Sequence, residues 1–213
     1  MRFYYYKLTS DDGGAPCAQD GLLSLALCKP MIRSTAEVGD VIFGFAAKSL
    51  DINNRLIYIA TITHKEIGGA YFKKMKYRSR RDCIYRWRGD RLKWNEAGFH
   101  GAGDLAHDVG DYPEYERANV LLSNDFRYFG KNGDAEYKDR YPAIKKAVEA
   151  LGQGHRNRHG EILLRQLESL KSDVWKKYKE QVLGNSTSVP ETDACHLKPC
   201  GGVEVSPRKR GGC

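Results

Sequence analysis

The run Val41–Ala46 contains no polar side chain and constrains the fold more than any other stretch of the chain. A short run of this kind is typical of a strand that is buried on both of its faces. Asn53 and Asn54 then mark a turn, and Arg55–His64 alternates polar and apolar residues as a half-buried strand does. The sequence therefore predicts a sheet that is covered on both sides.

The rest of the chain mixes strand and helix patterns. Further strands are expected at Arg2–Leu8, Asp82–Trp87 and Ala118–Ser123. The apolar run Gly21–Ile32 has roughly helical spacing, and Pro30 would end or kink that helix. Two more helices are expected at Tyr141–Leu151 and Glu161–Leu183. The second should pack one apolar face on the body, formed by Ile162, Leu163, Leu167, Leu170, Val174, Trp175, Tyr178 and Val182.

Segments without periodicity separate these elements. Asp11–Cys17 contains two glycines and a proline and is expected to form a loop. Residues 95–117 are rich in Gly, His and Asp, and loops of that length are usually functional or mobile. We expect a domain over residues 1–140, a helical extension packed on it over 141–184, and a disordered tail over 185–213.

Composition excludes several classes of protein. With 41% hydrophobic and 11% aromatic residues, the chain is neither wholly disordered, collagen-like nor a coiled coil. No stretch approaches the length of uncharged apolar sequence that a membrane span needs. The first residues lack the apolar segment of a secretion signal, so a cytoplasmic protein is expected.

Neither metal nor cofactor binding is expected from the motifs. The six cysteines are irregularly spaced, which argues against a disulfide framework, and Cys28 lies in an apolar run typical of core. Cys195, His196 and Cys200 have no second ligand pair nearby to close a zinc site. Glycine-rich nucleotide loops, HExxH and deaminase zinc patterns are all missing from the sequence.

Positive charge is concentrated in one block. The net charge is +8, and residues 71–100 alone hold ten basic and three acidic residues, interleaved with aromatic ones. Basic groups mixed with stacking groups suit a partner with phosphates and exposed bases, although a solvated basic loop is the structural alternative. Candidate phosphate contacts are Lys73, Lys74, Arg78, Arg80, Arg81 and Arg88.

Two polar clusters carry residue types that perform chemistry. Asp12 and Cys17 flank a double glycine and a proline, and a cysteine on such a loop acts as a nucleophile if its pKa is lowered. A His–Asp pair can serve as general base and orienting group, or as metal ligands. A tight turn and a solvated acidic loop are the respective structural alternatives. The second cluster contains His100, Asp104, His107 and Asp108.

A set of motifs in order resembles a known family. The Gly-Asp turn that enters Val41–Ala46, followed by the hairpin partner Leu56–Ile62, is similar to the PUA-like superfamily, in particular its EVE, YTH and ASCH branches. More specifically, residues 1–150 resemble the bacterial nucleotide modification-associated domain 2 family. The segments that carry this resemblance are Asp12–Cys17, Cys28–Arg33, Gly39–Ala46, Asp82–Tyr85, Asp104–Asp108, Arg117–Ser123 and Asp125–Gly130.

The resemblance implies an α+β fold: a PUA-like small mixed β-barrel with flanking helices and a C-terminal helical extension. It also implies a pocket that holds one modified base between aromatic faces. Stacking on these faces must offset the free energy lost when the base leaves its stack in the nucleic acid. Candidate faces are Tyr4, Tyr6, Tyr85, Trp87 and Trp94, and Tyr85 with Trp87 is the favoured pair. The expected pocket comprises Tyr6, Lys29, Tyr85, Trp87, Ser123, Asp125 and Arg127.

Three functions follow as hypotheses. The first, which we favour, is a reader of a modified base in DNA or of a nucleotide, associated with base modification or defence. The second is an enzyme of nucleobase modification or removal that uses the Asp12/Cys17 loop or the His107/Asp108 pair. The third is a module whose basic block docks an acidic protein.

Overall fold

A five-stranded sheet forms the centre of the fold, and its strands run in the order β10-β5-β4-β1-β11. The computed structural model describes residues 1–95 and 99–187. Neighbouring strands of this central sheet are antiparallel except β1 and β4, which are parallel, so their carboxyl ends meet at one edge. The strands are β1 (Phe3–Leu8), β4 (Val41–Ala46), β5 (Leu56–Thr61), β10 (Asp125–Tyr128) and β11 (His155–Arg156).

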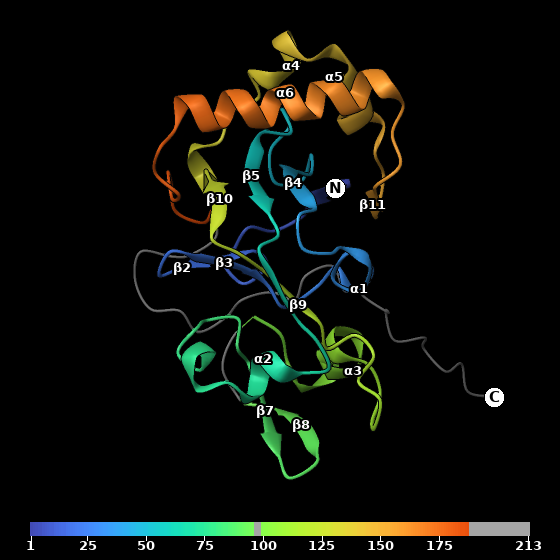
Figure 1. Cartoon of the computed structure of the whole chain (residues 1–213), viewed down its shortest axis with the longest axis vertical. Coiled ribbons are helices and arrows are strands. Elements are labelled where there is room, and N and C mark those ends of the chain that lie inside the picture. The colour runs from blue at the N-terminus through green and yellow to red at the C-terminus, as the bar shows by residue number, and fades with distance from the viewer. Residues whose placement is uncertain (96–98, 188–213) are drawn as a thin grey trace, which may run out of the picture.

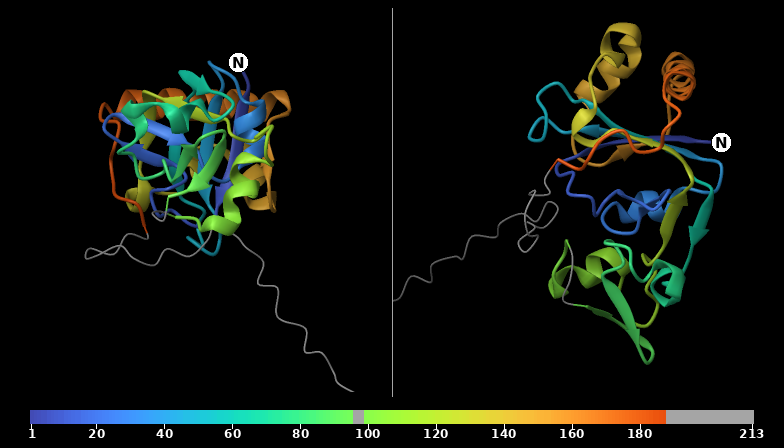
Figure 2. Two further views of the ribbon diagram at one scale, coloured as in Figure 1. Left: turned by 90° about the horizontal axis from the view of Figure 1, so that it is seen from below. Right: turned by 90° about the vertical axis from the view of Figure 1, so that its left-hand side faces the viewer.

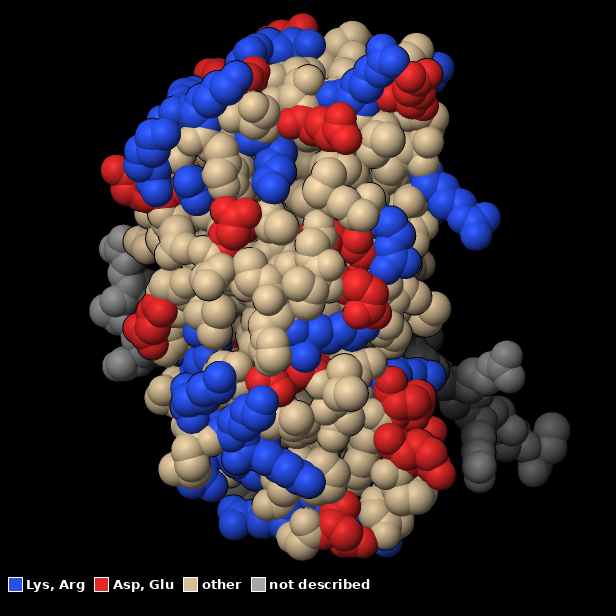
Figure 3. Space-filling view, viewed as in Figure 1, with Lys and Arg blue, Asp and Glu red and all other residues tan. Residues whose placement is uncertain are grey.

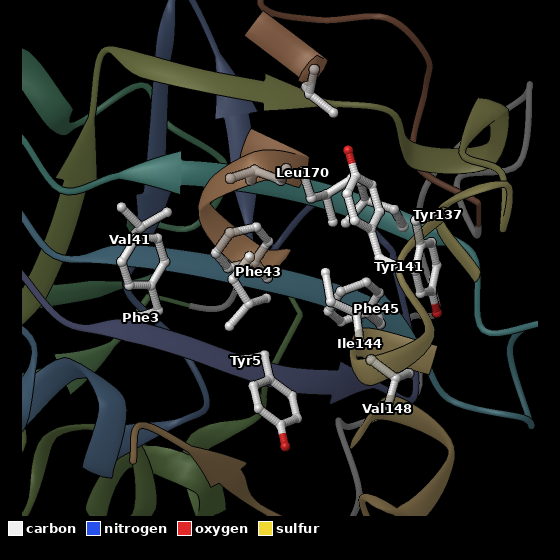
Figure 4. Close-up of a cluster of buried hydrophobic side chains, with 14 of the residues drawn as sticks. Phe3, Tyr5, Val41, Phe43, Phe45, Tyr137, Tyr141, Ile144, Val148 and Leu170 are labelled. Carbon is white, nitrogen blue, oxygen red and sulfur yellow. The ribbon is translucent and has the colours of Figure 1, made fainter. Parts of the chain in front are cut away.

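Three helices cover one face of the central sheet, with α6 crossing the top of Figure 1. Alternate residues of β1 and β4 point to this face, including Phe3, Phe43 and Phe45, and they pack against Ile144 and Leu170 (Figure 4). The helices are α4 (Tyr137–Arg140), α5 (Pro142–Ala150) and α6 (Glu161–Lys177).

A second sheet packs against the opposite face, in the strand order β2-β3-β9-β6. Tyr4, Tyr6 and Ile42 of the central sheet meet Leu23 and Leu121 of the second sheet in a separate core. The right-hand view of Figure 2 shows these layers stacked beneath the helices. The strands are β2 (Cys17–Gln19), β3 (Leu22–Leu25), β6 (His64–Glu66) and β9 (Val120–Ser123).

The outer face of the second sheet is covered by short helices and a hairpin. Their buried core includes Tyr71, Tyr85, Leu92, Val109 and Tyr115. The elements are α2 (Ala70–Lys73), η1 (Met75–Tyr77), β7 (Tyr85–Arg88), β8 (Arg91–Trp94), η2 (Ala102–Asp104) and α3 (Leu105–Val109). Two further short helices are α1 (Pro30–Thr35) and η3 (Gly130–Asn132).

The mixture of α and β structure is confirmed, and so is the double burial of Val41–Ala46. The PUA-like barrel is not confirmed, because the strands of residues 1–95 and 99–187 form two packed sheets and a hairpin without closing a barrel. The predicted strand over Asp82–Trp87 is confirmed only in part, since β7 begins at Tyr85. The division of the chain at residue 140 stays a prediction, and residues 188–213 of the predicted tail lie outside the described residues.

Two predicted helices differ from the structure. Most of Gly21–Ile32 is not helical: Leu22–Leu25 is strand β3, and Pro30 begins helix α1 instead of ending one. Proline suits the first turn of a helix because the N–H it lacks has no partner there. Helix α6 stops at Lys177, and the apolar side chains predicted at its ends, Ile162 and Val182, are exposed.

Candidate active site

Asp108 and His100 form a buried pair in the layer beneath the second sheet. Asp108 lies on α3, and its Oδ2 is 2.5 Å from Nδ1 of His100. The same carboxylate oxygen accepts a hydrogen bond of 2.8 Å from the hydroxyl of Tyr85. Burial raises the pKa of Asp108, but the hydrogen bond and positive charge of His100 outweigh it, and the pKa ends below its usual value. Asp108 is therefore ionised at neutral pH and orients the imidazole ring.

Cys28 completes a line of three side chains with this pair. Its Sγ lies 3.5 Å from Nε2 of His100, the ring nitrogen that faces away from Asp108. Its backbone N–H donates to Oδ1 of Asp108 at 3.0 Å, so the carboxylate holds the backbone of Cys28 as well as the imidazole of His100. A thiol, an imidazole and a carboxylate in this order are the arrangement that activates a cysteine nucleophile.

The backbone at Cys28 adopts an uncommon conformation. Cys28 and Lys29 have φ values of 54° and 42°, in the left-handed region that residues with a side chain rarely adopt. Conformations of this kind are unfavourable and persist where surrounding contacts enforce them, frequently at functional sites. Here the turn ends β3, begins α1 at Pro30 and places the thiol beside His100.

Arg33 connects the segment that carries Cys28 to the segment that carries Asp108. Its side chain is fully buried, and it donates to the backbone carbonyls of Cys28 at 2.7 Å and Asp108 at 2.6 Å. Burial lowers the pKa of Arg33 to about 10, so the guanidinium stays charged at neutral pH. One planar group thus fixes the segments that carry the thiol and the carboxylate. Two further acceptors are the carbonyls of Arg117 and Asn119.

Cys28 reaches the wall of a cavity of about 680 Å³, a volume in the range of small-molecule sites. The cavity lies where the carboxyl ends of the parallel strands β1 and β4 meet α1 and the segment before β11. Crevices at the carboxyl ends of parallel strands are common ligand sites. The site thus joins a thiol–imidazole–carboxylate line to a space that can admit a substrate.

The predicted pair His107/Asp108 is not formed. Adjacent residues of a helix point in different directions, so Asp108 faces His100 while His107 is exposed and lines the cavity. His100, grouped with Asp108 in the sequence, is the true partner. The sequence predicts Cys28 in the core, although the Pro30 that follows it signals a turn or a helix start.

The Asp12/Cys17 loop has the geometry of the structural alternative. Asp12 is buried and accepts a hydrogen bond of 2.9 Å from the N–H of Gly14. Cys17 is fully buried, and burial together with the nearby Asp82 raises its pKa to about 12. A thiol in this state is not ionised at neutral pH, and only a thiolate is strongly nucleophilic.

The predicted base pocket is divided between different places. Tyr6 and Lys29 line the cavity together, with Nζ of Lys29 5.1 Å from the centre of the Tyr6 ring. Tyr85 is fully buried and offers no face to a ligand. Trp87 donates to the carbonyl of Gly69 at 3.0 Å, and Nζ of Lys73 lies 4.3 Å from its ring centre. The favoured pair of aromatic faces is therefore not brought together.

Ser123, Asp125 and Arg127 do not line the cavity. Oγ of Ser123 donates to the carbonyl of Thr61 at 2.6 Å. Asp125 accepts from the indole of Trp175 at 2.7 Å, and Arg127 donates to the carbonyl of Tyr178 at 2.9 Å. These contacts give the three residues a structural part.

The basic block lies apart from the cavity, in the layer that contains α2 and η1. Figure 3 shows Lys and Arg side chains gathered toward the lower left of the face that it draws. Arg80 is not part of this surface, because it is buried and donates to the carbonyls of Cys17 and Gln19. The remaining candidates are exposed: Lys73, Lys74, Arg78, Arg81 and Arg88.

The described residues hold neither a metal-ligand cluster nor a membrane-spanning helix. In residues 1–95 and 99–187, no group of three or more His, Cys, Asp or Glu side chains is arranged to hold a metal ion. In the same residues, no helix combines the length and hydropathy that crossing a bilayer requires. The Cys195–Cys200 motif lies outside the described residues.

Comparison with known proteins gives one match. The sequence model of the nucleotide modification associated domain 2 family matches residues 1–186, which include every residue of the site described above. No curated protein and no solved structure matches the chain.

Proposed function

The chain belongs to the nucleotide modification associated domain 2 family, and from that premise we propose that it is a cysteine-dependent acyl-transfer enzyme that acts on a nucleotide. The observation that carries this proposal is the line Cys28–His100–Asp108 at the wall of a cavity. Membership of the family supports a nucleotide as the substrate, and the three side chains support acyl transfer as the reaction.

In the proposed reaction, Nε2 of His100 takes the proton of the Cys28 thiol. The thiolate attacks the carbonyl carbon of an ester or amide, either on the nucleotide or on a donor to it, and a C–S bond forms. The bond to the leaving alcohol or amine breaks, and the leaving group takes the proton from His100. Water or an amine then cleaves the thioester and restores the thiol. Asp108 stabilises the imidazolium throughout and does not itself take the proton.

A reader without chemistry, the favoured sequence-based hypothesis, has weaker support. It needs two aromatic faces open to a base, whereas Tyr85 is buried and Trp87 is covered on one side by Lys73. It would also give no reason for a thiol, an imidazole and a carboxylate to be aligned. Within the proposed enzyme, Tyr6 and Lys29 keep a part as walls of the substrate cavity.

The proposal is tested with a simple activated ester. Incubation with p-nitrophenyl acetate is expected to release a burst of about one equivalent of p-nitrophenolate, because Cys28 forms an acetyl thioester that breaks down more slowly. Peptide mass spectrometry should find the acetyl group on Cys28. The Cys28→Ala variant should lose the burst, whereas Cys83→Ala, which removes a buried thiol, should keep it. An undiminished burst from Cys28→Ala would contradict the proposal.

A further inference from the structure

We propose that the cavity beside Cys28 binds the phosphate of a free 5′-mononucleotide, and this inference rests on the proposed function for the nucleoside part of the ligand. The ionisable side chains of the cavity wall carry it. Among the described residues, the lining includes three lysines and two histidines but no aspartate or glutamate. They are Lys7, Lys29, Lys48, His107 and His155.

The fold brings the three lysines together from separate segments. Lys7 is near the carboxyl end of β1, Lys48 follows the carboxyl end of the parallel strand β4, and Lys29 precedes α1. Because β1 and β4 are parallel neighbours, both ends reach the same edge of the central sheet. The lysines therefore line one cavity from three segments, Lys7 beside Leu151 on the helix-covered side of the sheet and Lys29 beside Tyr6 on the other.

The described part of this wall holds no carboxylate, and Glu149 acts on Lys7 and Lys48 from outside it. Burial lowers the pKa of Lys7, the positive charges of Lys48 and Lys138 lower it further, and the negative charge of Glu149 on α5 opposes them in part. Nζ of Lys7 has only a neutral acceptor in its hydrogen bond of 2.8 Å, the carbonyl of Leu151. A ligand with two negative charges would relieve this repulsion and gain charge-assisted hydrogen bonds.

The imidazole ring of His155 lies in the same cavity wall. Burial lowers the pKa of His155, and the charges of Arg156 and Lys29 lower it further, so its imidazole is neutral at pH 7. The ring stacks on Tyr4, with the ring centres 5.9 Å apart. A flat, neutral ring beside the lysines suits the planar part of a nucleotide, since base stacking on aromatic side chains is favourable.

A polynucleotide fits this arrangement less well. Strands of nucleic acid are held by a row or groove of cations that follows the backbone. The exposed basic block, which includes Lys73, Lys74 and Arg78, contributes no side chain to the cavity. A cavity lined by three lysines and, among the described residues, by no carboxylate instead suits the compact dianion of a phosphate monoester.

The test is calorimetric titration of the full-length Cys28→Ala protein, which cannot turn a substrate over. The ligands are the four 2′-deoxynucleoside 5′-monophosphates, the four matching nucleosides, and a hexanucleotide without terminal phosphate. At least one monophosphate is expected to bind at least about tenfold more tightly than its nucleoside, and inorganic phosphate should compete with it. Lys48→Gln should weaken that binding about tenfold, the loss of one charge-assisted contact. Lys93→Gln removes the same charge from the distant strand β8 and should leave it unchanged.

Equal binding of nucleosides, tighter binding of the hexanucleotide, or no binding at all would overturn the inference. The acetylation of Cys28 described above is measured without any nucleotide, so the two ideas fail separately. A Cys28 burst without monophosphate binding would support the proposed acyl-transfer chemistry but contradict a mononucleotide as its substrate. Monophosphate binding without the burst would support a nucleotide-binding protein and contradict the proposed chemistry at Cys28.

Discussion

The His100→Asn variant is expected to react with iodoacetamide at Cys28 about 30-fold more slowly than the unaltered protein at pH 6. An ordinary thiol with a pKa of about 8.5 is only about 0.3% thiolate at that pH. A thiolate paired with an imidazolium is present almost in full, although its lower basicity reduces its intrinsic reactivity about tenfold. The product of the two effects gives the expected difference, and peptide mass spectrometry assigns the rate to Cys28.

His64→Asn is the matched control for this variant. His64 also pairs with a carboxylate, its Nε2 lying 3.0 Å from Glu66, but it is on strand β6 of the second sheet and not at the site. Its replacement should leave the rate at Cys28 unchanged. Equal rates in the His100→Asn variant and the unaltered protein would show that His100 does not activate the thiol.

Replacement of Arg33 by Met is expected to lower the free energy of unfolding by about 3–5 kcal/mol, because each buried acceptor left without a donor costs about 1–3 kcal/mol. Methionine fills much of the space of the arginine stem but donates no hydrogen bond. The carbonyls of Cys28 and Asp108, with two others, would stay buried without the donor they now share. Urea denaturation followed by tryptophan fluorescence measures the change.

Two further variants separate this effect from a general loss of charge. Arg33→Lys keeps the charge, but its single ammonium cannot reach all four carbonyls, so an intermediate loss is expected. Arg165→Met removes an exposed arginine that pairs with Glu161 on α6, and such pairs contribute less than about 1 kcal/mol. A loss below about 1 kcal/mol for Arg33→Met would contradict the claim that Arg33 holds the segments of Cys28 and Asp108 together.

The central sheet could be predicted because its signals are local. The continuous apolar run of Val41–Ala46 reflects the burial of β4 on both faces. The single half-buried strand predicted over Arg55–His64 is wrong in part, because β5 is buried on both faces and His64 begins β6 of the second sheet. Strand β3 could not be distinguished in this way. Leu23 and Leu25 pack into one core while Leu22 packs against another, so a strand buried on both sides leaves the same apolar run as a buried helix.

The candidate site could be predicted only in part, because its members are distant in the sequence. His100 and Asp108 are eight residues apart, close enough for composition and spacing to group them. Cys28 is 72 residues before His100, and only the packing of α1 against α3 brings them together. The three lysines of the cavity come from three segments, each with an ordinary charge pattern. No single stretch of the sequence contains the site.

The most direct test of the account is the rate at which iodoacetamide alkylates Cys28 between pH 5 and pH 9. If His100 holds the thiol as a thiolate, the rate at pH 6 should stay within a few-fold of the rate at pH 8. Glutathione, measured alongside, should slow about tenfold for each pH unit below its pKa. A Cys28 profile that falls in parallel with glutathione would contradict the central claim that Cys28, His100 and Asp108 form a catalytic assembly.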